Sequence, residues 1–264
     1  MENVLTQSKE ILEYEGIISP ELFEEYTNNW MEEEVLLLAR HFHKLNHTKG
    51  QFKRVDSFIA GQLGVDILNA VKPFGIEVFR IYMSLDGESK DEFTFIPIIY
   101  LLLKDGLEIT FPLIPKGRDE LVPGTTEQTV NSGGQIVPGI FKEMITQNWD
   151  IFDVNLIDDL FVAVDSDTRG RLRVDFYEIS GDLLTFINDK ILGNIKDFTL
   201  YPGVDMNKFQ NKNLISFTPT IGIVPQETIM TEIMSRHSVI EIPKEDSGEI
   251  FMEYLRPCPP TCPK

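Results

Sequence analysis

The sequence predicts a mixed α/β fold, of the α+β kind, made of two tandem copies of one unit. Each copy is expected to run helix, strand, helix, strand, strand around a mixed or antiparallel sheet, with a pseudo-twofold relation left open. Three observations predict this. Residues 18–30 recur as residues 136–149, further similarity follows in the same order, and the offset stays between 118 and 122 residues.

The matched positions are mostly aromatic, acidic, proline and glycine residues. In chain order, Pro20, Phe23, Asn29, Trp30, Val55, Asp56, Gly61, Tyr82, Asp86, Phe95, Pro97 and Ile99 are answered by Pro138, Phe141, Asn148, Trp149, Val174, Asp175, Gly181, Tyr201, Asp205, Phe217, Pro219 and Ile221. The chain has no other tryptophan. Because the offset is nearly constant through four segments, we interpret the pattern as an internal repeat.

The first helix of the unit is predicted from its start signal and its spacing. Pro20 suits the first turn of a helix, and Ser19 before it is a suitable N-cap. Phe23, Tyr26 and Trp30 follow at helical spacing, together with Leu22. We therefore expect this helix to bury an aromatic stripe.

A β-rich run, a second helix and two strands are expected to complete the unit. The run covers residues 55–59, and residues 174–179 in the second copy. The apolar positions of the second helix share one side, and Gly75 is a suitable C-cap; these positions are Leu63, Ile67, Leu68 and Val71. Residues 76–83 alternate as a half-buried strand does, and residues 93–103 are apolar on both faces. Pro97 and Pro219 cannot donate to a ladder, which predicts edges or bulges there.

The predicted organisation places the first unit at residues 1–119 and the second at 120–249. Residues 115–135 are rich in Gly, Pro, Ser and Thr and are predicted to form a linker, with the boundary near Pro123. Residues 250–264 form a tail rich in proline and cysteine. The sequence leaves open whether the copies form one merged sheet or two domains.

The net charge of −18 is spread over both halves, so nucleic acid and anionic membranes are poor candidates for partners. The longest apolar run, residues 96–103, has the length of a strand and contains a proline. The first residues lack the basic start and apolar centre of a signal peptide. We therefore expect a cytoplasmic protein, in which two free thiols are favoured over a disulfide.

The repeated core resembles a group of uncharacterised proteins common in Bacteroidota. The resemblance is carried by a helix that ends in tryptophan, a β-rich run, a short helix and then a G-I-x-x-x-R-I-Y segment with an acidic turn. It covers residues 18–103 best. The end of the chain, Cys258-Pro-Pro-Thr-Cys262, is similar to the C-P-P-x-C end of that family, which more often has an aromatic residue before the last cysteine. The resemblance implies no established activity and no catalytic residue.

Two groups of residues are candidate metal ligands. His41, His43 and His47 lie within seven residues, with Glu32–Glu34 nearby, and a helix would place His43 and His47 on one face. The sequence favours a solvated helix face followed by a loop. Cys258 and Cys262 flank three residues, but two thiolates make an incomplete zinc site. A stiff docking tail or an ordered chain end is the favoured interpretation.

Two loops and four repeated aspartates complete the candidates. Residues 165–170 open as a calcium loop does, but Phe176 replaces the bidentate glutamate, which favours a hydrophilic turn. Residues 131–135 suggest a phosphate-binding loop, but they lack its lysine and favour a hinge. The repeated aspartates could pair across the two copies as acids, bases or metal ligands, although an aspartate after a strand usually stabilises a turn. These aspartates are Asp56, Asp86, Asp175 and Asp205.

The sequence favours a non-enzymatic protein–protein interaction or assembly protein with a protein partner, and a homo-oligomer is left open. The basis is the abundance of aromatic residues and the lack of a complete catalytic motif. The alternative is a metal-dependent enzyme or a small-ligand-binding regulatory protein with a site between the copies. No cofactor is predicted, and a divalent metal at the histidines or cysteines is retained as the alternative.

Overall fold

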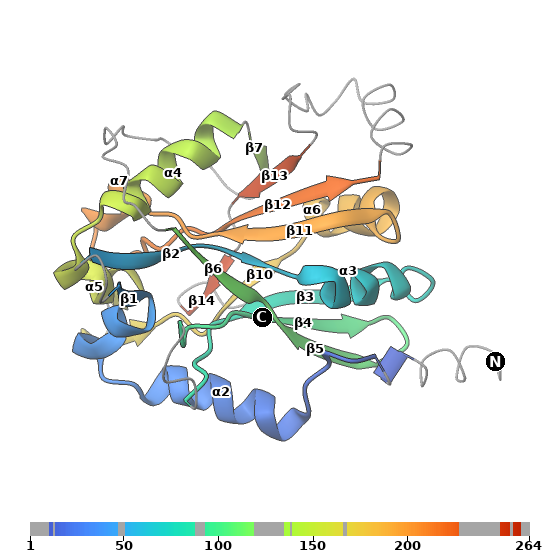
Figure 1. The fold of residues 1–264 in the computed structure, drawn as a ribbon, viewed down its shortest axis with the longest axis horizontal. Helices are drawn as coiled ribbons and strands as arrows, with labels where there is room; N and C mark the ends of the chain where they lie inside the picture. Colours follow the sequence, from blue (N-terminus) through green and yellow to red (C-terminus); the bar gives the residue numbers. More distant parts are fainter. Residues whose placement is uncertain are drawn as a thin grey trace.

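The structure, a computed structural model, confirms a mixed α/β fold with antiparallel sheets (Figure 1). It describes residues 11–12, 14–46, 51–87, 93–118, 135–137, 139–165, 168–226, 249–253 and 256–259. The predicted linker boundary near Pro123 lies outside the described residues, as do residues 131–134 of the hinge predicted at residues 131–135.

The described helices are short. They are α2 (Pro20–Glu32), α3 (Gly61–Ala70), α4 (Gly139–Ile151), α5 (Ile157–Leu160), α6 (Asp182–Phe186) and α7 (Met206–Phe209), with the 3-10 helices η1 (Val35–His41) and η2 (Val154–Leu156) and the π-helix η3 (Ile187–Ile191).

The strands of the first half are β1 (His43–Asn46), β2 (Gln51–Ile59), β3 (Ile76–Tyr82), β4 (Ile98–Leu103), β5 (Glu108–Pro112) and β6 (Ile114–Arg118). Those of the second half are β7 (Gln135–Val137), β8 (Val162–Val164), β9 (Arg171–Arg173), β10 (Phe176–Ile179), β11 (Ile195–Tyr201), β12 (Thr220–Pro225), β13 (Ile250–Glu253) and β14 (Arg256–Cys258).

The two large sheets exchange strands between the halves of the chain. One sheet has the order β1-β2-β11-β12-β13-β7, with β6 also paired to β2. The other has the order β14-β10-β3-β4-β5, and β8 and β9 form a separate hairpin. Strand β2 of the first half therefore joins the sheet of the second half, and β10 of the second half joins that of the first. Helices α2 and α4 lie on opposite sides of the pair of sheets (Figure 1).

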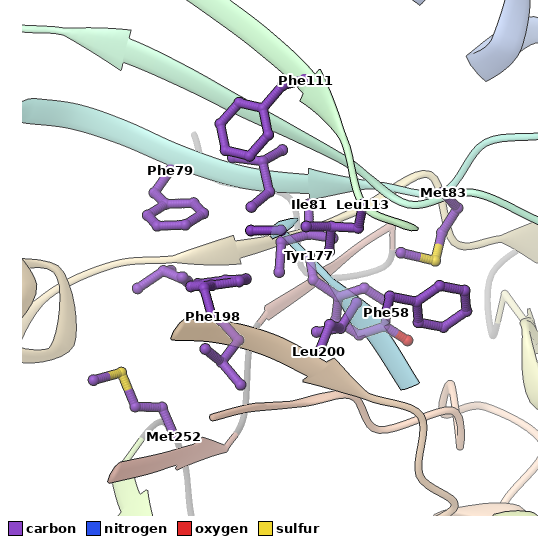
Figure 2. Packing of buried hydrophobic residues seen from close by; sticks show 14 of the residues in the cluster. Phe58, Phe79, Ile81, Met83, Phe111, Leu113, Tyr177, Phe198, Leu200 and Met252 are labelled. Atoms are coloured by element: carbon purple, nitrogen blue, oxygen red, sulfur yellow. The ribbon is translucent and has the colours of Figure 1, made fainter. Parts of the chain in front are cut away.

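One hydrophobic core joins the two sheets. Figure 2 shows Phe79 and Ile81 of β3 facing Phe198 and Leu200 of β11. The rings of Phe79 and Phe198 are stacked with 6.2 Å between their centroids. Since this core contains residues of both halves, the division at residue 119 does not separate two cores. The halves form one merged body.

The two tryptophans occupy matching surroundings. The indole N–H of Trp30 donates to the carbonyl of Val174 at 2.7 Å, and that of Trp149 donates to the carbonyl of Val55 at 2.8 Å. Both side chains are fully buried. The two donor residues are 119 residues apart in the sequence, and so are the two acceptor residues. Each bond links one half of the chain to the other. These contacts support the predicted duplication, which we retain as an inference.

A pair of asparagines links the halves in the same reciprocal way. The Asn69 amide donates to the carbonyl of Ile195 at 2.8 Å and accepts from its N–H at 2.8 Å. The Asn188 amide makes the same two bonds to Ile76, at 3.0 and 2.7 Å. Each side chain therefore takes the place of a neighbouring strand at the start of β11 or β3.

We expect Asn69→Ala and Asn188→Ala each to lower the free energy of unfolding by about 2–3 kcal/mol, because each removes two hydrogen bonds from one strand end. The exposed Asn28 is the control, and Asn28→Ala should change stability by less than about 0.5 kcal/mol. Urea denaturation followed by tryptophan fluorescence measures all three. Equal stability of Asn69→Ala and Asn28→Ala would contradict the linking role.

The start of the first helix is confirmed, and the end of the second differs from the prediction. Helix α2 begins at Pro20, and the Ser19 hydroxyl accepts from the Leu22 N–H at 3.3 Å. Helix α3 ends at Ala70 with Val71 as its C-cap, and Gly75, with φ +69° and its N–H donating to the Val71 carbonyl at 3.2 Å, closes the turn that follows the helix. The prediction for Leu63 is wrong: this residue was expected on the buried side of its helix, but it is 45% exposed.

The prolines and the chain end also correct the sequence analysis. Pro97 and Pro219 were expected at edges or bulges, but β4 and β12 begin just after them and each lies between two neighbours. A strand that starts after its proline loses no ladder bond. Residues assigned to the tail form β13 and β14, one strand in each sheet.

Candidate binding pocket beside the β8–β9 hairpin

His41 belongs to a polar cluster at the end of η1. Its side chain is largely buried, with Nδ1 2.5 Å from the Thr94 hydroxyl and Nε2 3.1 Å from a Glu33 carboxylate oxygen. Arg40 also binds Glu33, at 2.8 Å. Burial lowers the pKa of His41. The cluster ties the chain ahead of β4 to η1, and the sequence analysis did not find it because Thr94 is 53 residues away.

His43 has separate partners. It lies in β1, and not on the predicted helix. Its Nδ1 is 2.7 Å from the Ala39 carbonyl and its Nε2 accepts from Arg54 at 2.6 Å, so Nδ1 carries the proton. Burial lowers the pKa of His43 to about 4. His47 lies outside the described residues, and among those described no group of three or more His, Cys, Asp or Glu is placed to hold a metal.

Arg54 is a buried residue that the sequence analysis missed. Its guanidinium donates to the carbonyl of Trp149, to that of Asp150 at 3.2 Å and to that of Phe152 at 2.7 Å. These carbonyls lie at the C-terminal end of α4, where a helix leaves carbonyls unpaired. Arg173, 119 residues later, donates to the carbonyl of Trp30 at the end of α2. The repeat of the two arginines was the signal available in the sequence.

The repeated aspartates have structural partners where the structure shows them. Asp205 caps α7, its carboxylate accepting from the N–H groups of Asn207 at 2.9 Å and Lys208 at 3.3 Å. The backbone N–H of Asp86 donates to Thr94 at 2.8 Å. Burial raises the pKa of Asp175. Asp205 therefore has the turn-stabilising role that the sequence favoured.

Cys258 is disulfide-bonded, so the expected free thiol is wrong at this position, and no thiolate is left there for a metal. Cys262 lies outside the described residues.

The loop opened by Asp165 is a turn between β8 and β9, in which Asp165 and Gly170 are linked by a backbone hydrogen bond of 2.9 Å. This confirms the hydrophilic turn.

A cavity of about 400 Å³ opens beside the β8–β9 hairpin. Helices α5 and α7, which contribute to its wall, lie at the same end of the molecule (Figure 1). Five apolar side chains line it: Leu156, Val162, Val164, Phe209 and Leu214. Its volume lies within the range of about 300–1,000 Å³ typical of ligand sites.

Local contacts hold this pocket open. The Val164 N–H donates to the Lys212 carbonyl at 2.7 Å, and the Ser216 N–H donates to Leu160 at 3.1 Å, which fixes the segment after α7 against β8 and α5. The Phe209 ring packs edge-on against Phe152 with centroids 4.9 Å apart. The wall is therefore supported by backbone bonds and the core.

The rim of the pocket is exposed, apolar and basic. Leu156 and Leu214 are each 42% exposed. Arg171 and Lys212 also line the pocket, and neither side chain has a hydrogen bond or ion pair with another residue in the part of the chain that the structure describes. With Asp159, the lining has a formal charge of +1 in a chain of −18.

The pocket lies where the two halves differ. The residue 119 positions before Val162 is His43, which is held by Arg54, and the residue before Asp159 by the same offset is Arg40, which binds Glu33. Valine has no polar group to satisfy, so the second half keeps an apolar wall at the matching position. A comparison of the two halves of the sequence at this offset shows the difference, but does not show a cavity.

The outer faces of the sheets differ between the halves as well. Tyr82 packs edge-on against Phe23 with centroids 5.0 Å apart. In the second half Lys142 lies 4.3 Å from the Tyr201 ring, whose hydroxyl donates to Glu249 at 3.1 Å. Burial, with the Glu249 carboxylate beside it, raises the pKa of Tyr201. Since these groups satisfy one another, the pocket is the better candidate site.

Comparisons with known proteins add no family. No protein-family model matches the chain, and searches of curated proteins and of solved structures found no match. Among the described helices, none combines the length and the apolar character needed to cross a membrane.

Proposed function

We propose that this chain is a non-enzymatic interaction or assembly protein that binds a protein partner through the pocket beside the β8–β9 hairpin. The observation that carries the proposal is the pocket itself, with two leucines 42% exposed at its rim. Exposed apolar side chains around a concavity are typical of interaction sites. Homo-oligomerisation is one form that such an interaction can take.

The repeat supports this choice of surface. The repeated tryptophans, and the arginines and asparagines 119 residues apart, all bond to the backbone of the opposite half, which is a structural role. A binding function is then expected at positions where the halves differ. The pocket is such a place.

The proposal predicts a difference between two matched leucines. Leu156 lines the pocket, and Leu37, 119 residues earlier, is 37% exposed on the first half. We expect Leu156→Asp to weaken binding at least tenfold, because it places a charge in an apolar contact, while Leu37→Asp changes binding less than twofold.

The binding measurement uses peptides selected on the full chain from a random displayed library, with affinity determined by fluorescence polarisation. Thermal melts check that both variants are folded. Peptides that bind wild type and Leu156→Asp equally would contradict the pocket as the binding surface.

The alternative is a metal-dependent enzyme or a small-ligand-binding regulatory protein. The cavity volume supports the small-ligand form of this alternative. The metal form would need His43 to exchange its bonds to Arg54 and Ala39 for a metal ion. A thermal-shift screen of nucleotides and metabolites, and metal analysis of wild type and His43→Ala, test the two forms. Stoichiometric zinc or manganese that is lost in His43→Ala would favour the enzyme.

A cytoplasmic location is retained from the sequence as a proposal. The disulfide at Cys258 weighs against it, because disulfides persist mainly in oxidising compartments. Alkylation of the protein in intact cells, followed by mass spectrometry of the cysteine peptide, distinguishes a reducing from an oxidising compartment. An oxidised Cys258 in the cell would place the chain outside the reducing cytoplasm.

A further inference from the structure

We propose that the segment bound in the pocket is acidic as well as apolar: a large apolar residue enters the pocket and a neighbouring Asp or Glu meets Arg171 and Lys212. This inference rests on the proposed function and specifies its partner. The partner is a protein segment, and a free amphipathic carboxylate is an outcome that the experiment separates.

The charges of the lining carry the first step. Arg171 and Lys212 are exposed and lack polar partners among the described residues, so their charges are available to a ligand. The chain as a whole has a formal charge of −18. A basic rim on an acidic surface attracts an acidic segment to this place and repels it elsewhere.

The backbone carries the second step. Arg171 pairs with Val164 across the β8–β9 hairpin, and the Val164 N–H binds the Lys212 carbonyl. Arg171 and Lys212 therefore flank strand β8 on its two sides, next to the apolar wall that Val164 helps to form. A guanidinium beside an apolar floor suits a carboxylate that follows a large apolar side chain.

Asp159 sets a limit on this specificity. It lines the same pocket and its carboxylate opposes a second acidic residue of the ligand on that side. We therefore expect a ligand with one acidic residue beside its apolar anchor to be preferred over a ligand with a run of acids.

The test is a charge reversal with a matched control. Peptides are selected from a random displayed library on the full wild-type chain, and the best is measured against Arg171→Glu/Lys212→Glu and against Lys104→Glu/Lys196→Glu. The control lysines are exposed and lie outside the pocket, and both doubles change the net charge by the same amount. Melting curves establish that each variant is folded.

The expected result is enrichment of peptides in which Asp or Glu adjoins a large apolar residue. Affinity should fall at least tenfold in Arg171→Glu/Lys212→Glu and less than threefold in the control, and added salt should weaken wild-type binding.

Two results would overturn the inference and can be told apart. Apolar peptides without acid enrichment, which bind the charge-reversed variant normally but not Leu156→Asp, would remove the acidic preference and leave the proposed function. No Leu156-dependent peptide at all would remove both. In that case stabilisation of the wild type by decanoate, and not of Leu156→Asp, would assign the pocket to a small carboxylate.

Discussion

Replacing Arg54 with alanine is expected to lower the free energy of unfolding by about 3–5 kcal/mol. Arg54 is 2% exposed, and its guanidinium donates to three backbone carbonyls at the end of α4 and to His43. Without Arg54 those buried acceptors have no donor. A buried acceptor without a donor lowers the free energy of unfolding by about 1–3 kcal/mol, and water that enters the site offsets part of the sum. Its charge persists at neutral pH, since burial lowers the pKa of Arg54 only to about 10.

The matched variant is Arg173→Ala. Arg173 is half-buried, lies over the Trp30 ring at 5.6 Å as Arg54 lies over Trp149 at 5.5 Å, and donates to one carbonyl, that of Trp30. We expect a loss of about 1–2 kcal/mol for this variant. Urea denaturation with both tryptophans as reporters gives the two values. An Arg54→Ala protein as stable as Arg173→Ala would show that the additional bonds do not stabilise the fold.

Acidification is expected to destabilise the fold through His43, by about 3 kcal/mol between pH 6.5 and 4. Burial and the charge of Arg54 lower the pKa of His43 from 6.5 to about 4. The unfolded chain therefore takes up a proton at a higher pH than the folded chain, and the stability present above pH 6.5 is lost as the pH falls towards 4. A shift of this size corresponds to about 3 kcal/mol.

The control for this prediction is His43→Gln, whose side-chain oxygen can still accept from Arg54 but does not titrate. Burial raises the pKa values of Asp158 and Asp175, so these two groups stabilise the fold as the pH falls. Burial lowers the pKa of His41, so His41 adds to the loss of stability caused by His43. All three groups remain in His43→Gln, so the difference between the two stability curves isolates His43. Parallel curves for wild type and His43→Gln from pH 7 to 4 would contradict the assignment.

Local elements could be predicted from the sequence because their signals are local. The start of α2 follows from Pro20 and Ser19, and the turn after α3 from Gly75, which takes φ +69°. The turn at Asp165 follows from its polar residues. The expected helix through His43 failed, because residues 43–46 pair with β2 as strand β1, where Arg54 opposite His43 also donates to its ring, and this pairing outweighs local periodicity.

The candidate site was only partly visible in the sequence. Arg171 and Lys212 are 41 residues apart, and neither lies in a recognised motif. They line one pocket because the Val164 N–H binds the Lys212 carbonyl, a contact set by the packing of two distant segments. The comparison of His43 with Val162 marks the position where the halves differ, but a cavity requires all of its walls.

The sequence by itself determined the α/β class, the two helices and three strands expected in each half, and the matched positions with their nearly constant offset. Tertiary structure alone decided that β2 and β10 cross into the sheet of the opposite half, and that one core serves both sheets. The physical reason is that strand partners are chosen by burial and backbone bonds between segments far apart in the sequence, 94 to 142 residues for these two strands. A pattern read along the chain records which residues are apolar, and not which distant strand covers them.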